Sequence, residues 1–230
     1  GRRHHPQGRQ CHGYRARRRN RRSEKNEVKA VAYSSNPKAE ISDLYKNICY
    51  PMIGLHPCYV DEDYENELKK IKNHLNKKKV IAIGEIGIDL YREKKFFEQQ
   101  LDAFETQCYW ALENKLPVVI HTRNSLKETI NIISKPHFKD LNGIFHCFDS
   151  SYEDAMKLID LGFLIGIGGI LTFKNSNLRE TIAKIGIEKL VLETDSPYLS
   201  PEPKRGKINE PSYIIHTVEY IANMIGVSVE

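Results

Sequence analysis

The sequence predicts an α/β fold, a TIM-like (β/α) barrel whose first strand is atypical or missing and whose C-terminal helix we expect to be truncated. Three observations support this prediction. Short apolar runs alternate along the chain with amphipathic helical segments, which is typical of parallel βαβ units. Four of these runs lead into a residue that can bind a metal ion, and a barrel gathers its functional side chains at the ends of its strands. The length of 230 residues also suits one such barrel.

Seven strands are expected from the apolar runs. The runs are continuous rather than alternating, as expected for strands covered on both faces. They occupy residues 28–33, 50–55, 79–91, 117–121, 143–146, 163–167 and 190–193. A closed barrel of this type has eight strands, so the count is one short. An open doubly wound sheet is the alternative, but it would collect its site at one switch point and not around a ring of strand ends.

The helices are predicted from apolar residues at helical spacing and from their end signals. They are expected at residues 38–46, 61–76, 98–114 and 177–185, and from about residue 211 onward. Asn124 or Ser125 can cap a further helix. Ser150 and Ser151 each open a capping box, which predicts a helix through Leu161.

The first 27 residues differ in composition from the rest of the chain. Residues 1–23 contain nine arginines, no lysine and no acidic residue, whereas the remainder uses 22 lysines and only four arginines and has a net charge of −4. The opening stretch also lacks the apolar residues that a buried strand needs. We therefore expect an Arg-rich segment at 1–27 that is disordered or artefactual, followed by one barrel domain at 28–230.

Cysteine content and hydropathy bear on the cellular location. Five cysteines without a CxxC pair favour a reducing, intracellular compartment, either the cytoplasm or the nucleus. The longest uncharged stretch, residues 161–173, is too short to span a membrane, so no membrane association is expected.

Four strand ends carry side chains that bind cations: Glu85, His121, His146 and Asp195. A carboxylate at the end of a buried strand is costly unless a partner neutralises it, and a metal ion does this well. A lone histidine after a strand is usually only hydrogen-bonded, but four such ends in succession predict a metal site. Cys147, next to His146, is expected to face the opposite side of its strand and to lie in the core.

Seven stretches, taken together and in this order, resemble the TatD family of metal-dependent deoxyribonucleases, which are amidohydrolase-like barrels. The stretches are GLHP (54–57), AIGEIGID (82–89), PVVIHTR (117–123), HCF (146–148), GIGGILTFKN (166–175), LETDSPYLSP (192–201) and RGKINEP (205–211). The resemblance covers the chain from about residue 28 to its end.

This resemblance implies a divalent metal centre at the mouth of the barrel, with one or two ions of Mg²⁺, Zn²⁺ or Mn²⁺. The family's ligand positions fall on Glu85, His121, His146 and Asp195. Glu85 and Asp195 are the implied catalytic residues; Glu85 would bridge two ions, and Asp195 would orient or deprotonate the attacking water. The residues implied to bind substrate or to support the ligands are His56, Asp89, Arg123, Arg205 and Asn209.

The implied function is hydrolysis of DNA phosphodiester bonds by metal-activated water, as a 3′–5′ exonuclease. DNA is the expected partner, and the chain is expected to be a monomer. Two alternatives stay open. One is a small-molecule amide or ester hydrolase on the same barrel. The other is a nucleic-acid-binding homologue whose metal site is impaired.

One departure from the family pattern bears on activity. The family opens with a strand that ends in an H-x-H pair and holds one of the two ions. Here the opening offers His4, His5 and His12, none of which follows an apolar run. Adjacent residues on a strand face opposite ways, so His4 and His5 cannot act as one chelating pair. We therefore expect this chain to hold at most one ion of the pair and to be impaired as a hydrolase.

Overall fold

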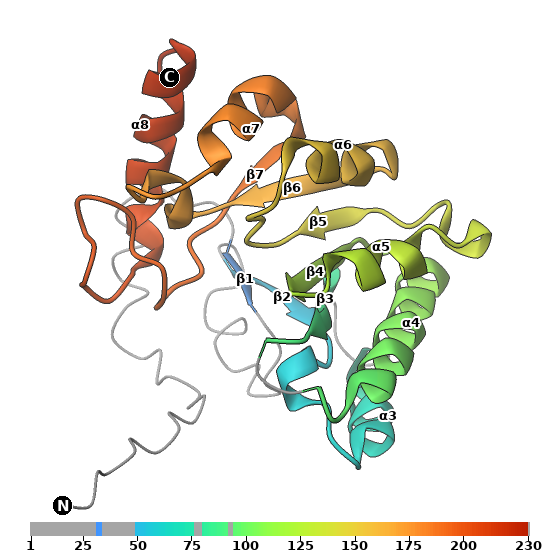
Figure 1. Cartoon of the computed structure of the whole chain (residues 1–230). Coiled ribbons are helices and arrows are strands. Elements are labelled where there is room, and N and C mark those ends of the chain that lie inside the picture. Colours follow the sequence, from blue (N-terminus) through green and yellow to red (C-terminus); the bar gives the residue numbers. More distant parts are fainter. Residues whose placement is uncertain (1–30, 34–48, 76–79, 92–93, 230) are drawn as a thin grey trace, which may run out of the picture.

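The fold is built on one parallel sheet that curls into an open barrel with helices on its outer face, as the computed structural model shows (Figure 1). The structure describes residues 31–33, 49–75, 80–91 and 94–229. In these described ranges the sheet has seven strands, each paired in parallel with the next strand along the chain. Within the described residues β1 and β7 are the two edges of the sheet. The predicted parallel (β/α) barrel is therefore confirmed.

All seven predicted strands are present. They are β1 (Val31–Tyr33), β2 (Cys49–Ile53), β3 (Ala82–Asp89), β4 (Val118–Arg123), β5 (Gly143–Phe145), β6 (Phe163–Ile167) and β7 (Leu190–Leu192). β4 runs two residues past His121, because it pairs with β3 as far as Asp89 opposite Arg123. The expected strand residues 28–30, the segment 1–27 with its histidines and the expected helix 38–46 lie outside the described residues.

The α-helices alternate with the strands and form the outer layer (Figure 1). They are α3 (Tyr64–Leu75), α4 (Phe97–Asn114), α5 (Leu126–Ile133), α6 (Tyr152–Asp160), α7 (Leu178–Ile185) and α8 (Ile214–Ile225). Short 3-10 turns are η2 (Pro57–Tyr59), η3 (Pro136–Phe138), η4 (Gly169–Thr172), η5 (Ile187–Lys189) and η6 (Pro211–Tyr213). Among the described helices, none combines the length and the apolarity that crossing a bilayer requires.

The capping signals before α6 are only partly as predicted. Ser151 caps the helix, since its hydroxyl accepts a hydrogen bond from the backbone N–H of Asp154 at 3.1 Å. Ser150 instead donates to the carboxylate of Asp154 at 2.6 Å. Because Asp154 is also in the first turn, its charge lies where the helix dipole favours an anion.

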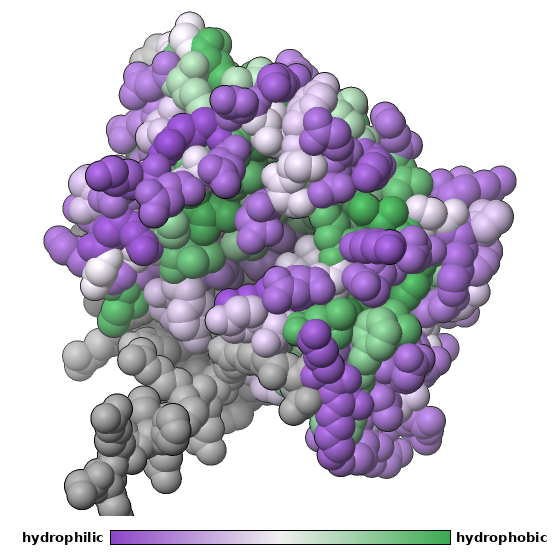
Figure 2. All heavy atoms as spheres, viewed as in Figure 1, coloured by the Kyte–Doolittle hydropathy of each residue, from purple (hydrophilic) through white to green (hydrophobic). Residues whose placement is uncertain are grey.

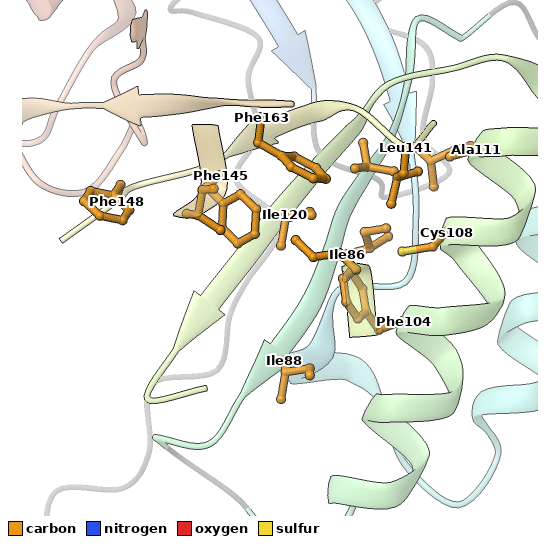
Figure 3. Close-up of a cluster of buried hydrophobic side chains, with 14 of the residues drawn as sticks. Ile86, Ile88, Phe104, Cys108, Ala111, Ile120, Leu141, Phe145, Phe148 and Phe163 are labelled. Atoms are coloured by element: carbon orange, nitrogen blue, oxygen red, sulfur yellow. The ribbon is translucent and has the colours of Figure 1, made fainter. Parts of the chain in front are cut away.

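The core lies between the sheet and its helices and fixes the positions of β3 and β4. Figure 3 shows Phe104 and Cys108 of α4 directed toward Ile86 of β3, and all three side chains are fully buried. Phe145 and Phe163 of the neighbouring strands β5 and β6 pack edge to face, with ring centroids 5.2 Å apart. On the outside, the face shown in Figure 2 is largely hydrophilic, with hydrophobic residues gathered in smaller patches.

β3 contains an irregularity at the residue that matters most for the site. Gly84 lies opposite Val119 and Ile86 opposite Ile120, so Glu85 is an extra residue in the pairing with β4. Such a bulge re-aims a side chain and is frequent beside active sites.

Gly87, two residues further along β3, allows a close approach of the two backbones. Its φ is +140°, and a Cβ added there would overlap the backbone carbonyl of His121 in β4. Only glycine combines this backbone conformation with the missing side chain.

Gly87→Ala should lower the free energy of unfolding by at least about 2 kcal/mol more than Gly206→Ala does. Both glycines have positive φ, but a Cβ at Gly206 would meet nothing within 4 Å. Comparing the two variants therefore separates the cost of steric overlap with β4 from the cost of backbone strain. Urea denaturation followed by circular dichroism measures both variants. Equal losses would mean that the β3–β4 approach does not constrain the fold.

Candidate metal centre

The candidate ligands come from five positions, two inside strands and three beyond the C-terminal ends of strands, and barrel enzymes build their sites on this side of the sheet. Glu85 lies within β3 and His121 within β4. His146 directly follows β5, and Asp195 follows β7 by three residues. His56 follows β2 and caps the turn η2.

His56, Glu85 and His121 form one group. Each offers a ligand atom, and these atoms all lie within 4.8 Å of one another. The Nε2 of His56 is 3.5 Å from a carboxylate oxygen of Glu85, and the rings of His56 and His121 have centroids 4.5 Å apart. The Nδ1 of His56 accepts a hydrogen bond from the backbone N–H of Cys58. The sequence placed His56 among the substrate-side and supporting residues, but the geometry makes it a candidate ligand as well.

His146, Cys147 and Asp195 form a second group with the same spacing of ligand atoms. The Nε2 of His146 is 3.7 Å from a carboxylate oxygen of Asp195. The prediction that Cys147 faces the core is wrong. Cys147 lies beyond the end of β5 with φ +50°, so the alternation of a strand no longer applies, and its side chain is half-buried beside His146.

The two groups are adjacent parts of one centre. The rings of His121 and His146 are roughly parallel, with centroids 6.3 Å apart. Glu85 of the first group acts electrostatically on both His146 and Asp195 of the second. The four predicted ligands are thus neighbours although they are far apart in sequence. That they bind the metal stays a prediction.

Asp89 holds His121 in place. Its carboxylate is buried and lies 3.0 Å from the Nε2 of His121. Burial opposes its charge, but hydrogen bonds with His121, the Tyr91 backbone and Cys58 outweigh burial and lower the pKa of Asp89 to about 2. An ionised carboxylate on one ring nitrogen fixes the tautomer and leaves the other nitrogen, Nδ1, for a metal ion.

Glu193 plays the corresponding part for His146, and sequence reasoning missed it. One carboxylate oxygen lies 2.8 Å from the Nδ1 of His146, and the other accepts a hydrogen bond from the backbone N–H of Cys147. A Cβ at Gly166 of β6 would come within 3.0 Å of this carboxylate, so glycine there makes room for it. The only signal in the sequence is a second carboxylate two residues before Asp195.

The electrostatics of the centre suit a cation. Burial raises the pKa of Asp195, the histidines His146 and His121 lower it, and the charges of Glu85 and Glu193 raise it, to about 6. Burial alone would lower the pKa of His146, but its hydrogen bond with Glu193 and the nearby carboxylates raise it to about 9. Carboxylates crowded in a half-buried space need positive charge. Imidazole and carboxylate together form a donor set that fits Zn²⁺ or Mn²⁺.

The other predicted residues, Arg123, Arg205 and Asn209, are each held by a defined contact. Arg123 stacks on the ring of Tyr91, with the guanidinium carbon 3.7 Å from the ring centroid. Arg205 stacks on Phe173 at 3.8 Å. Asn209 is buried, and its amide donates to the backbone carbonyls of Thr194 and Tyr198 on either side of Asp195. Asn209 therefore holds the loop that carries Asp195.

A cavity of about 760 Å³ lies between the segment from the end of β4 through α5 and the segment from Phe148 into α6. Thr122 and Asn124 line it from one side, and Phe148 and Asp149 from the other. Most of its lining comes from α5 and α6, and the candidate ligands are not part of it.

A (β/α) barrel with imidazoles and carboxylates clustered at its mouth is the arrangement of a metal-dependent hydrolase. The chain matches the family model described as TatD related DNase over residues 5–230, and it belongs to this family. The match begins upstream of residue 28, where the motifs start, and the domain boundary at residue 27 stays a prediction.

Individual relatives agree with the family. A protein of Buchnera aphidicola subsp. Baizongia pistaciae, named as an uncharacterized metal-dependent hydrolase, is 38% identical over 203 residues, which is 83% of this chain and 76% of that protein. The 3′-5′ ssDNA/RNA exonuclease TatD of Pantoea ananatis is 32% identical over 209 residues, covering 86% and 79%. The crystal structure of YJJV, a TatD homolog from Escherichia coli K12, superposes with a TM-score of 0.81 at 26% identity, covering 89% and 82%.

Glu193→Gln should weaken the binding of Mn²⁺ or Zn²⁺ by about 10- to 100-fold. The carboxylate accepts hydrogen bonds at both oxygens, whereas an amide has one acceptor and would turn a donor toward either His146 or the Cys147 backbone. Isothermal titration measures the affinity. The exposed Glu188→Gln is the matched control and should bind as the original chain does. Unchanged affinity in Glu193→Gln would show that Glu193 does not position His146.

Proposed function

We propose that this chain hydrolyses DNA phosphodiester bonds as a 3′–5′ exonuclease that depends on one or two divalent ions. One observation carries the proposal: Glu85, His121, His146 and Asp195 gather at the barrel mouth, and the exposed Arg123 follows His121 by two residues on the same strand. The name of the Pantoea ananatis relative, an exonuclease acting on single-stranded DNA and RNA, supports it.

The chemistry follows from the residues at this centre. A divalent ion held there would supply a Lewis acid for a phosphoryl oxygen and would lower the pKa of a water molecule. Asp195, whose pKa is raised to about 6, is suited to accept a proton from an attacking water molecule near neutral pH. Glu193 and Asp89 keep His146 and His121 oriented.

The guanidinium groups suit an anionic substrate. Arg123 and Arg205 are exposed, and each is held by stacking on an aromatic ring. A guanidinium presents a planar fork of donors that matches two phosphate oxygens and stays charged at every relevant pH. Charge developing on the phosphoryl oxygens would therefore meet fixed positive charge.

The test of this function uses the purified full chain, stripped of metal and resupplied with Mg²⁺, Mn²⁺ or Zn²⁺ in turn. The substrates are 5′-labelled single-stranded DNA, the same label in a blunt duplex, and a panel of p-nitrophenyl esters and amides. We expect a ladder of shortened 5′-labelled products from DNA with at least one ion. Turnover of esters or amides without any DNA cleavage would overturn the nuclease proposal in favour of a small-molecule hydrolase.

Asp195→Asn should lower kcat on labelled DNA by at least about 100-fold, because the amide cannot accept the proton. The metal-free variant should be no less stable than the original chain at pH 8. The raised folded pKa means that ionised Asp195 opposes folding above its unfolded pKa, and the amide removes this cost. Asp160→Asn on the exposed end of α6 is the control and should retain full activity. Retained turnover in Asp195→Asn would rule out the assigned role.

A further inference from the structure

A flat, exposed stack of two side chains lies beside the candidate metal centre. The ring of Tyr91 is 60% exposed, and the guanidinium of Arg123 covers one of its faces at 3.7 Å. Within the described residues Arg123 forms no ion pair with a carboxylate. Its charge is therefore available to a ligand, while its plane is fixed by the ring.

The backbone ties this stack closely to the centre. The N–H of Tyr91 donates to one carboxylate oxygen of Asp89 at 2.9 Å, and the other oxygen of Asp89 lies 3.0 Å from His121. Arg123 follows His121 by two residues and pairs with Asp89 in the sheet. The N–H of Leu90 donates to the carbonyl of Arg123 at 2.9 Å, and this hydrogen bond links the C-terminal ends of β3 and β4. The stack is thus positioned by the elements that position the candidate ligands.

An exposed aromatic ring with a guanidinium on one face is suited to stacking a flat, electron-rich group. Nucleobases have this shape, and each base that stacks on an aromatic side chain contributes to binding without regard to sequence. The guanidinium can meanwhile contact the phosphate of the same nucleotide.

We propose that Tyr91 and Arg123 form a base-stacking subsite that holds one unpaired nucleotide next to the scissile phosphate. This inference rests on the proposed nuclease function and assigns the recognition of an unpaired end to two residues of this chain. A base within a duplex is already stacked on both faces and cannot enter the subsite without being unpaired, so frayed or single-stranded ends are preferred over blunt duplex ends.

The first experiment compares two single-stranded oligonucleotides that differ only in their bases. One is ordinary DNA, and in the other the last three 3′ nucleotides are abasic. The original chain should have a kcat/KM about 5- to 100-fold higher on the ordinary strand, because the stacked base lowers KM. Tyr91→Ala should remove this difference, and Tyr91→Phe should retain it, because phenylalanine keeps the stacking face.

The matched control is Tyr109→Ala. Tyr109 is also an exposed tyrosine, 42% exposed, and it stacks on His137 with centroids 5.3 Å apart. It lies in the second half of α4, away from the strand ends that carry the candidate ligands. This variant should show the same preference for bases as the original chain. Loss of the preference in Tyr109→Ala as well, or its persistence in Tyr91→Ala, would overturn the subsite.

A second measurement separates failure of the subsite from failure of the nuclease proposal. Fluorescence anisotropy reports binding of the same two oligonucleotides to Asp195→Asn, with and without Tyr91→Ala, and needs no turnover. We expect Tyr91→Ala to weaken binding of the ordinary strand about 5- to 100-fold and binding of the abasic strand little. If the original chain cleaves no DNA but this difference appears, the subsite stands and the nuclease proposal fails. If Tyr91→Ala binds both strands as the parent does, the subsite is excluded.

Discussion

The close approach of β3 and β4 is the constraint on which the site depends. Gly87 allows the backbone of β3 to lie against that of His121, and the register that follows places Asp89 opposite Arg123. The buried carboxylate of Asp89 then reaches the ring of His121, and its other oxygen accepts from the backbone of Tyr91. A candidate ligand, its supporting carboxylate and the exposed aromatic stack are therefore set by one strand pairing.

The second organising feature is a concentration of negative charge that the fold alone does not balance. Glu85, Glu193 and Asp195 lie close to one another in a half-buried space, and burial together with repulsion by the other two carboxylates raises the pKa of Asp195. In the absence of an ion, protonated His146 supplies part of the missing positive charge. Exchanging that proton for a divalent cation couples metal binding to pH and to folding. The crowded carboxylates thus lower the stability of the folded chain at the candidate metal centre.

The architecture could be predicted well from the sequence because its signals are local. β6 begins and ends at the residues that its apolar run predicts, and α4 differs from its predicted range by one residue. Unbroken apolar runs between helical segments leave few alternatives to a parallel sheet, and their order along the chain is their order in the barrel. Boundaries set by pairing were less predictable, as the extension of β4 past His121 shows.

The sequence by itself determined the parallel barrel, the family and the four strands that bring Glu85, His121, His146 and Asp195 to the site, because hydrophobic period and motif spacing are properties of neighbouring residues. Only the tertiary structure decided which side chains support them. Glu193 reaches His146 across 47 positions of sequence, and Asp89 reaches His121 across 32. The side chain of Cys147 lies beside His146 because β5 ends before it. His56 lies next to Glu85 because the chain turns after the end of β2. Such contacts depend on register and on backbone conformation beyond strand ends, which no local pattern encodes.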